Sequence, residues 1–371
     1  MGIPEKIKAI EEEIHKTQIN KATEFHIGLL KAKIAKLKRE LEENTHGKTV
    51  AKGGGSVGYD IRKSGDATVS LIGFPSVGKS TLLNSLTNAK SKTGSYQFTT
   101  LTAVPGMMEH RGAKIQILDL PGIIKGASTG KGMGKRVLSV ARNSDLVLIV
   151  LDVFQPQHLS ILIEELSNIG VKINSRPPNV LVNKSSTGGL SVNIQVQTNV
   201  TEKLVREIFR VYGIHNGSVT IREPNLSTEE LIDVVNENRV YIPCVVVLNK
   251  IDLVNKEFLE SVSRTIGIEF VSVSANSNMY IEKLKDVIYK KLDFVSIYLK
   301  PKGGETDFKE PLIMMRGCTV KDVCNKLHRN LVKDFKFANV WGTSVKFPGQ
   351  KTGLDHVLHD KDILTITKKI S

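Results

Sequence analysis

The feature that most constrains this chain is the run Gly73-Phe74-Pro75-Ser76-Val77-Gly78-Lys79-Ser80, which has the spacing of a phosphate-binding loop. Residues 68–72 read as a buried β-strand and residues 81–86 as the start of a helix, which is the context that this motif requires. The glycines let backbone N–H groups turn towards anionic oxygens, and the helix start adds partial positive charge. The run therefore predicts a site for nucleotide phosphates. The alternative is an accidental glycine turn before a helix.

Each residue of the loop has an expected role. We predict that Lys79 neutralises the β- and γ-phosphates and that Ser80 Oγ binds Mg²⁺. The residues expected to contact the nucleotide in and just after the loop are Gly73, Pro75, Ser76, Val77, Gly78, Lys79, Ser80 and Thr81.

Length and charge narrow the class of protein. A chain of 371 residues predicts about two or three domains. Its net charge of +14 indicates a polyanionic partner, with nucleic acid as the first candidate, although a solvated basic surface is the alternative. We expect no signal peptide and no membrane span. The cysteines Cys244, Cys318 and Cys324 have no metal-ligand spacing, so we expect reduced thiols in a cytoplasmic protein.

Apolar residues at helical spacing predict a hairpin of two amphipathic helices over residues 3–45. Basic residues lie between the apolar positions of its second helix: Lys31, Lys33, Lys36, Lys38 and Arg39. The hairpin is expected either to contact RNA or to brace the next domain, and both roles could hold. The glycine-rich residues 53–56 that follow are interpreted as a flexible joint.

From residue 66 onward, strands alternate with helices, which predicts a parallel sheet with helices on both faces. One strand, at 113–118, ends in Asp119-Leu120-Pro121-Gly122. Asp119 is placed to organise Mg²⁺, and the Gly122 N–H can face a γ-phosphate. Thr100 could reach the metal ion and sense the γ-phosphate, unless it is an ordinary surface threonine. The glycine-rich segment after Gly122 is typical of a nucleotide-dependent switch.

A second motif predicts which base is bound. The strand 244–248 ends in Asn249-Lys250-Ile251-Asp252. The Asp252 carboxylate can accept from N1–H and the 2-amino group of guanine, whereas adenine has neither donor there. Asn249 can reach the O6/N7 edge, and Lys250 can lie along the base and brace the phosphate loop. The loop Ser274-Ala275-Asn276 can offer a backbone N–H to O6. The order of these motifs predicts a guanine-nucleotide site.

Two further regions complete the chain. The segment between residues 171 and 241 is too long for one crossover, so we interpret it as an inserted subdomain whose role could be packing alone. From residue 294, strand-like runs surround a helix that Thr319 and Asp322 begin with a capping box, which predicts a small mixed sheet on one helix. Basic residues mark one side of this region, unless they form a solvated helix face: Lys321, Lys326, Arg329, Lys333 and Lys336.

The chain resembles the DRG family (developmentally regulated GTP-binding proteins), which is related to the Obg GTPases. The stretches that carry the resemblance are Asn20-Lys21-Ala22-Thr23, GFPSVGKS at 73–80, Phe98-Thr99-Thr100-Leu101, DLPGIIKGA at 119–127, Asn249 to Asp252, and Lys300-Pro301-Lys302-Gly303. The resemblance implies a helical hairpin at 1–46 and a Gly-rich linker at 47–65. It implies a P-loop GTPase domain at 66–171 and 240–292, an S5D2-like α+β insertion at 172–239, and a ubiquitin-like (β-grasp) TGS domain at 293–371. It also implies a role with ribosomes in translation and a protein partner.

The chain departs from ordinary small GTPases at one catalytic position. Where they have a glutamine that orients the attacking water, this chain has Ile123, as the Obg relatives do. A hydrocarbon side chain cannot hold a water molecule. Some relatives use K⁺ with an asparagine in the phosphate loop, but this chain has Ser76 there, so its use of K⁺ is an open question.

These features predict a cytoplasmic GTPase that hydrolyses GTP to GDP and phosphate with Mg²⁺. Lys79, Thr100 and Gly122 are the expected catalytic residues, and Ser80, Thr100 and Asp119 the expected metal ligands. The expected macromolecular partner is the ribosome or another RNA, with no evident DNA specificity. The alternative is an RNA-binding scaffold whose nucleotide is mainly structural. An ATP-dependent kinase is disfavoured because Asp252 would reject adenine.

Overall fold

The structure is a computed structural model that describes residues 2–18, 20, 23–45, 64–87, 104–122, 140–237, 239–328 and 330–369. The chain divides into two compact units. The first comprises Met1–Gly58 and Gly170–Tyr241, and the second comprises Tyr59–Ile169 and Ile242–Ser371. Among the helices of the described residues, none is long and apolar enough to cross a membrane.

A six-stranded sheet forms the centre of the second unit, with strand order β11-β10-β4-β1-β3-β2. Its strands are β1 (Ala67–Ile72), β2 (Val104–His110), β3 (Ala113–Asp119), β4 (Leu146–Asp152), β10 (Cys244–Asn249) and β11 (Phe270–Ser272). All neighbours pair in parallel except β2, which lies antiparallel to β3 at one edge. This central sheet confirms the predicted parallel-rich α/β class. The strand β2 was not predicted, because Pro105 and Gly106 weaken its strand pattern.

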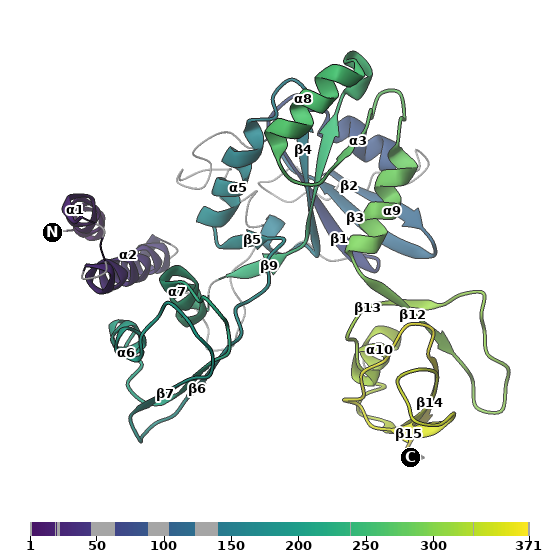
Figure 1. The fold of residues 1–371 in the computed structure, drawn as a ribbon. Coiled ribbons are helices and arrows are strands. Elements are labelled where there is room, and N and C mark those ends of the chain that lie inside the picture. The colour runs from purple at the N-terminus through teal and green to yellow at the C-terminus, as the bar shows by residue number, and fades with distance from the viewer. Residues whose placement is uncertain are drawn as a thin grey trace. The chain divides into compact units, whose positions relative to one another are not determined.

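Helices cover both faces of the central sheet, which explains why every residue of β1 is buried. Leucines and isoleucines of α3 (Lys79–Leu86) and α9 (Ile281–Lys291) enter the core on one face. Figure 1 shows α5 (His158–Asn168) on the opposite side. The short helix η1 (Ile251–Leu253) and α8 (Lys256–Ile266) follow β10.

The C-terminal part of the second unit is a five-stranded sheet on one helix, as predicted, with strand order β13-β12-β16-β14-β15. Its strands are β12 (Phe294–Leu299), β13 (Leu312–Met315), β14 (Phe335–Trp341), β15 (Gln350–Thr352) and β16 (Ile363–Lys368). The helix α10 (Val320–Leu327) begins at a capping box of Thr319 and Asp322, which confirms that prediction. It ends sooner than its apolar pattern indicates, but Leu331 still packs in the core.

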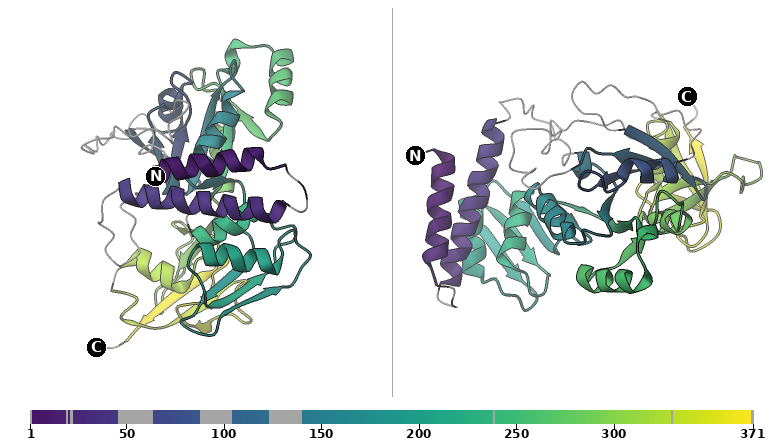
Figure 2. Two further views of the ribbon diagram at one scale, coloured as in Figure 1. Left: turned by 90° about the vertical axis from the view of Figure 1, so that its left-hand side faces the viewer. Right: turned by 90° about the horizontal axis from the view of Figure 1, so that it is seen from above.

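The first unit joins the N-terminal hairpin to the insertion. The helices α1 (Ile3–Lys16) and α2 (Glu24–Thr45) lie side by side (Figure 2). The insertion holds a three-stranded sheet and two helices: β6 (Val180–Lys184), β7 (Leu190–Ile194), β8 (Gly217–Ile221), α6 (Glu202–Val211) and α7 (Thr228–Asn236). A short pair, β5 (Val171–Ile173) and β9 (Val240–Ile242), flanks it. Ala32 of α2 lies in one core with Phe209 of α6 and Leu231 of α7.

The basic residues of α2 mostly face this insertion. Lys31 forms an ion pair with Glu229, and Lys36 Nζ donates to the Val211 carbonyl oxygen 2.8 Å away. Arg39 donates to the Asn236 carbonyl oxygen at 3.3 Å. Of the two roles left open for the hairpin, these contacts favour the brace, and they leave fewer cations for RNA on this helix.

Candidate nucleotide-binding site

The phosphate loop (residues 73–80) lies between β1 and α3, as its motif requires. Gly78 precedes the first helical residue with φ +92°, in the left-handed region that favours glycine. A Cβ on Gly78 would lie 2.4 Å from Asn249 Nδ2, and one on Gly73 would lie 2.5 Å from the Val150 carbonyl oxygen. Both glycines are therefore needed for close packing as well as for backbone direction.

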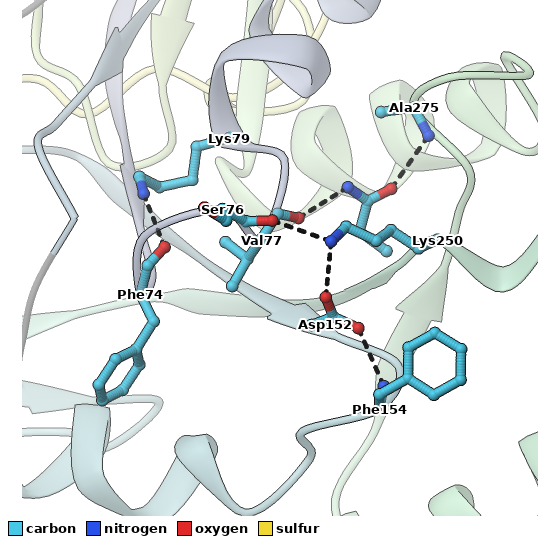
Figure 3. Close-up of polar contacts among 9 residues, drawn as sticks. Phe74, Ser76, Val77, Lys79, Asp152, Phe154, Lys250 and Ala275 are labelled. Carbon is cyan, nitrogen blue, oxygen red and sulfur yellow. Dashed lines mark hydrogen bonds and ion pairs between the residues drawn. The ribbon is translucent and has the colours of Figure 1, made fainter. Parts of the chain in front are cut away.

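The ammonium group of Lys79 lies over its own loop. Its Nζ donates to the carbonyl oxygen of Phe74 at 3.0 Å (Figure 3). It also donates to the carbonyl oxygen of Gly73 at 3.2 Å. Burial lowers the pKa of Lys79, and the nearby Asp119 carboxylate opposes that shift. A cation held at the loop in this way is placed to meet phosphate oxygens.

Ser80 and Asp119 come together at the carboxyl edge of the central sheet. Asp119 is the last residue of β3, and Ser80 Oγ donates to its Oδ2 at 2.5 Å. Its other oxygen, Oδ1, is buried and has no hydrogen-bond partner among the described residues. A hydroxyl next to an unpaired carboxylate oxygen is an oxygen-only donor set that fits Mg²⁺. The third predicted ligand, Thr100, lies outside the described residues, as does Ile123.

Gly122 lies against the phosphate loop. A Cβ at this position would be 2.7 Å from the Pro75 backbone nitrogen and 2.9 Å from the proline ring carbons Cγ and Cδ. Backbone atoms cannot give way as a flexible side chain can, so only glycine fits here. The structure thus brings Gly122 to the loop that the sequence predicted it would serve.

Asn249 connects two segments of the site. Its Nδ2 donates to the Val77 carbonyl oxygen at 2.9 Å, and its Oδ1 accepts from the Ala275 N–H at 3.0 Å. The side chain is buried, and an amide carries two N–H donors, so one donor remains for the predicted contact with a base. The Ala275 N–H already donates to Asn249 Oδ1, so the O6 atom of a bound guanine would have to share this donor with Asn249.

Lys250 connects the phosphate loop to residues 249–252, the segment expected to recognise the base and called the base-reading segment below (Figure 3). Its backbone is left-handed, with φ +67°, and its Nζ donates to the Ser76 carbonyl oxygen at 2.9 Å, as the predicted brace requires. The same Nζ forms an ion pair with Asp152 Oδ2 at 2.7 Å. Sequence reasoning missed Asp152. The available signal was an acidic residue at the end of a buried strand that pairs with β10, where Asp152 lies opposite Asn249.

The remaining predicted residues lie at the same edge. Asp252 is exposed in η1, two positions after Lys250. Ser274 is buried, and its Oγ hydrogen-bonds to Ser277 Oγ at 2.7 Å, which shapes the loop that carries Ala275 and Asn276. The exposed Asp252 carboxylate is thus placed to meet a ligand rather than to stabilise the core.

Known families match the chain in three successive parts. The family model of the 50S ribosome-binding GTPase matches residues 68–184, and that of the C-terminal region of the MMR_HSR1 domain matches residues 187–294. The TGS domain model matches residues 295–368.

Full-length relatives are also similar. An uncharacterized GTP-binding protein of Methanocaldococcus jannaschii is 52% identical, over 100% of this chain and 94% of that protein. Developmentally-regulated G-protein 1 of Arabidopsis thaliana is 47% identical over 100% and 92%. Developmentally-regulated GTP-binding protein 1 of Xenopus laevis is 46% identical over 99% and 100%.

Proposed function

The chain belongs to the family of developmentally regulated GTP-binding proteins, and from that premise we propose that it binds GTP at the site described above and hydrolyses it as a molecular switch. The observation that carries this proposal is the convergence of three motifs at one edge of one sheet. Lys79 follows β1, Asp119 ends β3, and Lys250 follows β10. Ligands of open α/β sheets bind at this carboxyl edge.

The residues divide the work of hydrolysis. Lys79 holds the β- and γ-phosphates, and the Gly122 N–H faces the γ-phosphate. Ser80 and Asp119 would hold Mg²⁺, which when bound neutralises charge on the phosphate oxygens. Asp252 reads guanine, while Asn249 and Lys250 keep its segment against the phosphate loop. The oxygen of the attacking water forms a bond to the γ-phosphorus as the bond from the γ-phosphorus to the β-γ bridging oxygen breaks. The proton that the water loses goes to a γ-phosphate oxygen, so the products are GDP and phosphate.

We propose that hydrolysis is slow without a partner. Ile123 replaces the side chain that orients water in small GTPases, so the expected rate is on the order of 10⁻³ s⁻¹ or below. Single-turnover hydrolysis by the purified full chain tests this. A rate of several per second would mean that the chain contains a water-orienting group of its own.

We further propose that the protein acts in the cytoplasm with the ribosome or another RNA, and that its C-terminal sheet makes the contact. On the face away from α10, Lys300 Nζ lies 5.2 Å from the Trp341 ring centre, and Lys351 Nζ lies 4.8 Å from that of Phe337. Among the described residues, the strands β12, β14, β15 and β16 contribute no acidic side chain to this face. Aromatic rings with cations beside them are typical of single-stranded RNA surfaces. The net charge of +14 supports the same partner.

The predicted basic side around α10 is a weaker candidate. Lys326 Nζ lies 2.6 Å from Asp66 Oδ1 and 2.6 Å from the Ile313 carbonyl oxygen, so it stabilises the fold of its own unit. Lys321 is exposed on the same helix and offers a matched control.

Co-sedimentation with ribosomes tests the RNA proposal, with GDP, with a non-hydrolysable GTP analogue and without nucleotide. Point variants are preferable to removing the domain, because Phe294 and Ile313 belong to the core beneath the central sheet. We expect Trp341→Ala with Lys351→Glu to weaken pelleting, and Lys321→Glu to leave it near that of the wild type. Undiminished pelleting of the double variant would exclude this face. Hydrolysis that ribosomes never accelerate would favour the scaffold alternative.

A further inference from the structure

The Asp152 carboxylate is held from two sides. It ends β4 beside Asn249, which ends β10. Its Oδ1 accepts the Phe154 N–H at 3.0 Å, and its Oδ2 pairs with Lys250 Nζ at 2.7 Å (Figure 3). Its side chain is only 14% exposed, so the ion pair is shielded from water and salt more than a surface pair is. The backbone bond fixes the direction in which the carboxylate faces Lys250.

Lys250 needs such a support. A lysine ammonium is a point charge on a flexible four-carbon stem, so one hydrogen bond to a carbonyl oxygen does not by itself hold it in place. The bond from its Nζ to Ser76 is a direct link between the base-reading segment and the phosphate loop. These are the two parts of the site that must separate from the nucleotide before it can leave.

We propose that Asp152 is a positioning residue that sets how long guanine nucleotide stays bound, by holding Lys250 against the phosphate loop. The proposal rests on the proposed GTP binding and assigns no catalytic contact to Asp152. Removing its carboxylate releases Lys250 Nζ from the Ser76 carbonyl oxygen. The phosphate loop and the base-reading segment then lose the contact that holds them against each other. Within the described part of the chain, the Asp152 carboxylate hydrogen-bonds to Phe154 and Lys250 and not to Asp252, so base selection stays with Asp252.

The expected effect is on nucleotide release. A charge-assisted hydrogen bond of this kind predicts roughly tenfold faster GDP dissociation from Asp152→Ala. Asp152→Asn keeps one acceptor oxygen, so it can serve Phe154 or Lys250 but not both, and an intermediate rate is expected. Hydrolysis within a preloaded complex should change much less than release, because Asp152 acts through Lys250 and not on the phosphates.

A double-mutant cycle tests the proposal. Release of fluorescent N-methylanthraniloyl-GDP is measured by stopped flow for the full-length wild type, Asp152→Ala, Lys250→Met and the double variant. If Asp152 acts through Lys250, the double variant releases GDP no faster than Lys250→Met alone. Additive effects, or slower release from Asp152→Ala, would overturn the proposal.

Two controls separate the possible failures. Asp286→Ala removes another paired carboxylate, 2.8 Å from His110 Nε2 and 2.6 Å from Arg111 Nη2, and should release GDP at the wild-type rate. An equal acceleration in Asp286→Ala would show a general loss of stability and would overturn the assignment. If the wild type itself fails to bind the labelled GDP, the proposed function fails with it. If the wild type binds and the cycle is additive, only the role of Asp152 fails.

Discussion

Ser80 Oγ donates to Asp119 Oδ2 at 2.5 Å, although the two residues belong to different motifs 39 positions apart in the chain. The contact exists because β1 and β3 are parallel neighbours whose carboxyl ends meet at one edge, with Leu71 opposite Asp119. The neighbouring oxygen of Asp119 is buried without a partner among the described residues, so the pair has unused capacity for a cation.

We therefore expect Lys79→Ala and Ser80→Ala to lower GTP hydrolysis by on the order of 10²–10³-fold, because each removes positioned charge or a metal oxygen from the phosphates. Ser80→Ala should also weaken the dependence of nucleotide binding on Mg²⁺. Single-turnover assays and binding with and without Mg²⁺ measure both effects, and circular dichroism checks the fold. Turnover near the wild-type rate would contradict the assignment of the phosphate loop.

Substitution of Gly122 should have a similar effect for a steric reason. The added Cβ of Gly122→Ala would lie 2.7 Å from the Pro75 nitrogen, so the phosphate loop must shift. We expect a loss of GTP affinity and hydrolysis of at least about tenfold. Gly353→Ala is the matched control, because nothing lies within 4 Å of its Cβ position. Equal activity of the two variants would mean that the segment at Gly122 adapts freely.

The sequence predicts which segments come together at this edge of the sheet because its motifs are local. Gly73 to Ser80 and Asn249 to Asp252 each carry their chemistry within a few residues, and strand ends predict where they meet. Asp152 was missed because its place at the end of a buried strand does not by itself indicate its partner, Lys250, which is 98 positions away. The same is true of Lys31, whose partner Glu229 is 198 positions distant. Its charge alone did not decide between a contact with RNA and a brace against the next domain.

The core of the first unit gives a prediction about stability. Phe209 of α6 is fully buried, and Phe209→Ala should reduce the stability of that unit by roughly 3–5 kcal/mol through lost burial and a new cavity. Hydrogen exchange at the amides of α6 and α7 measures this change within the unit. Phe347→Ala removes a ring that is 60% exposed, and should leave the exchange unchanged. Equal protection in both variants would contradict a shared core.

The cysteine thiols should resist alkylation in the native protein. Burial raises the pKa of Cys244 to about 12, and burial also raises the pKa values of Cys318 and Cys324. Thiolate is the reactive form, so labelling by iodoacetamide at pH 8 should be slow when folded and fast in guanidinium. The neutral Cys244 thiol stabilises the fold fully below about pH 9, and this contribution is lost as the pH rises towards 12. Rapid native labelling of Cys244, detected by mass spectrometry, would contradict its burial.

Base recognition provides the most specific prediction: Asp252→Asn should shift the preference from guanine towards xanthine nucleotides. The exposed carboxylate offers only acceptors, which suit the N1–H and 2-amino donors of guanine. Xanthine keeps N1–H but has a carbonyl in place of the amino group, so it meets Asp252 acceptor against acceptor. An asparagine amide supplies one acceptor for N1–H and one donor for that carbonyl.

The same asparagine faces guanine with its NH₂ against the 2-amino group, donor against donor. Each mismatch leaves a desolvated polar group without a hydrogen bond, which costs roughly 1–3 kcal/mol of binding free energy. Competition between GTP and XTP for the wild type and the variant measures the change, and the Asp286→Ala protein should keep the wild-type preference. A variant that still prefers GTP as strongly as the wild type would show that Asp252 does not read the base. The contacts of Asn249 and Lys250 with the phosphate loop do not distinguish one base from another. These contacts alone could not then account for the selection of guanine.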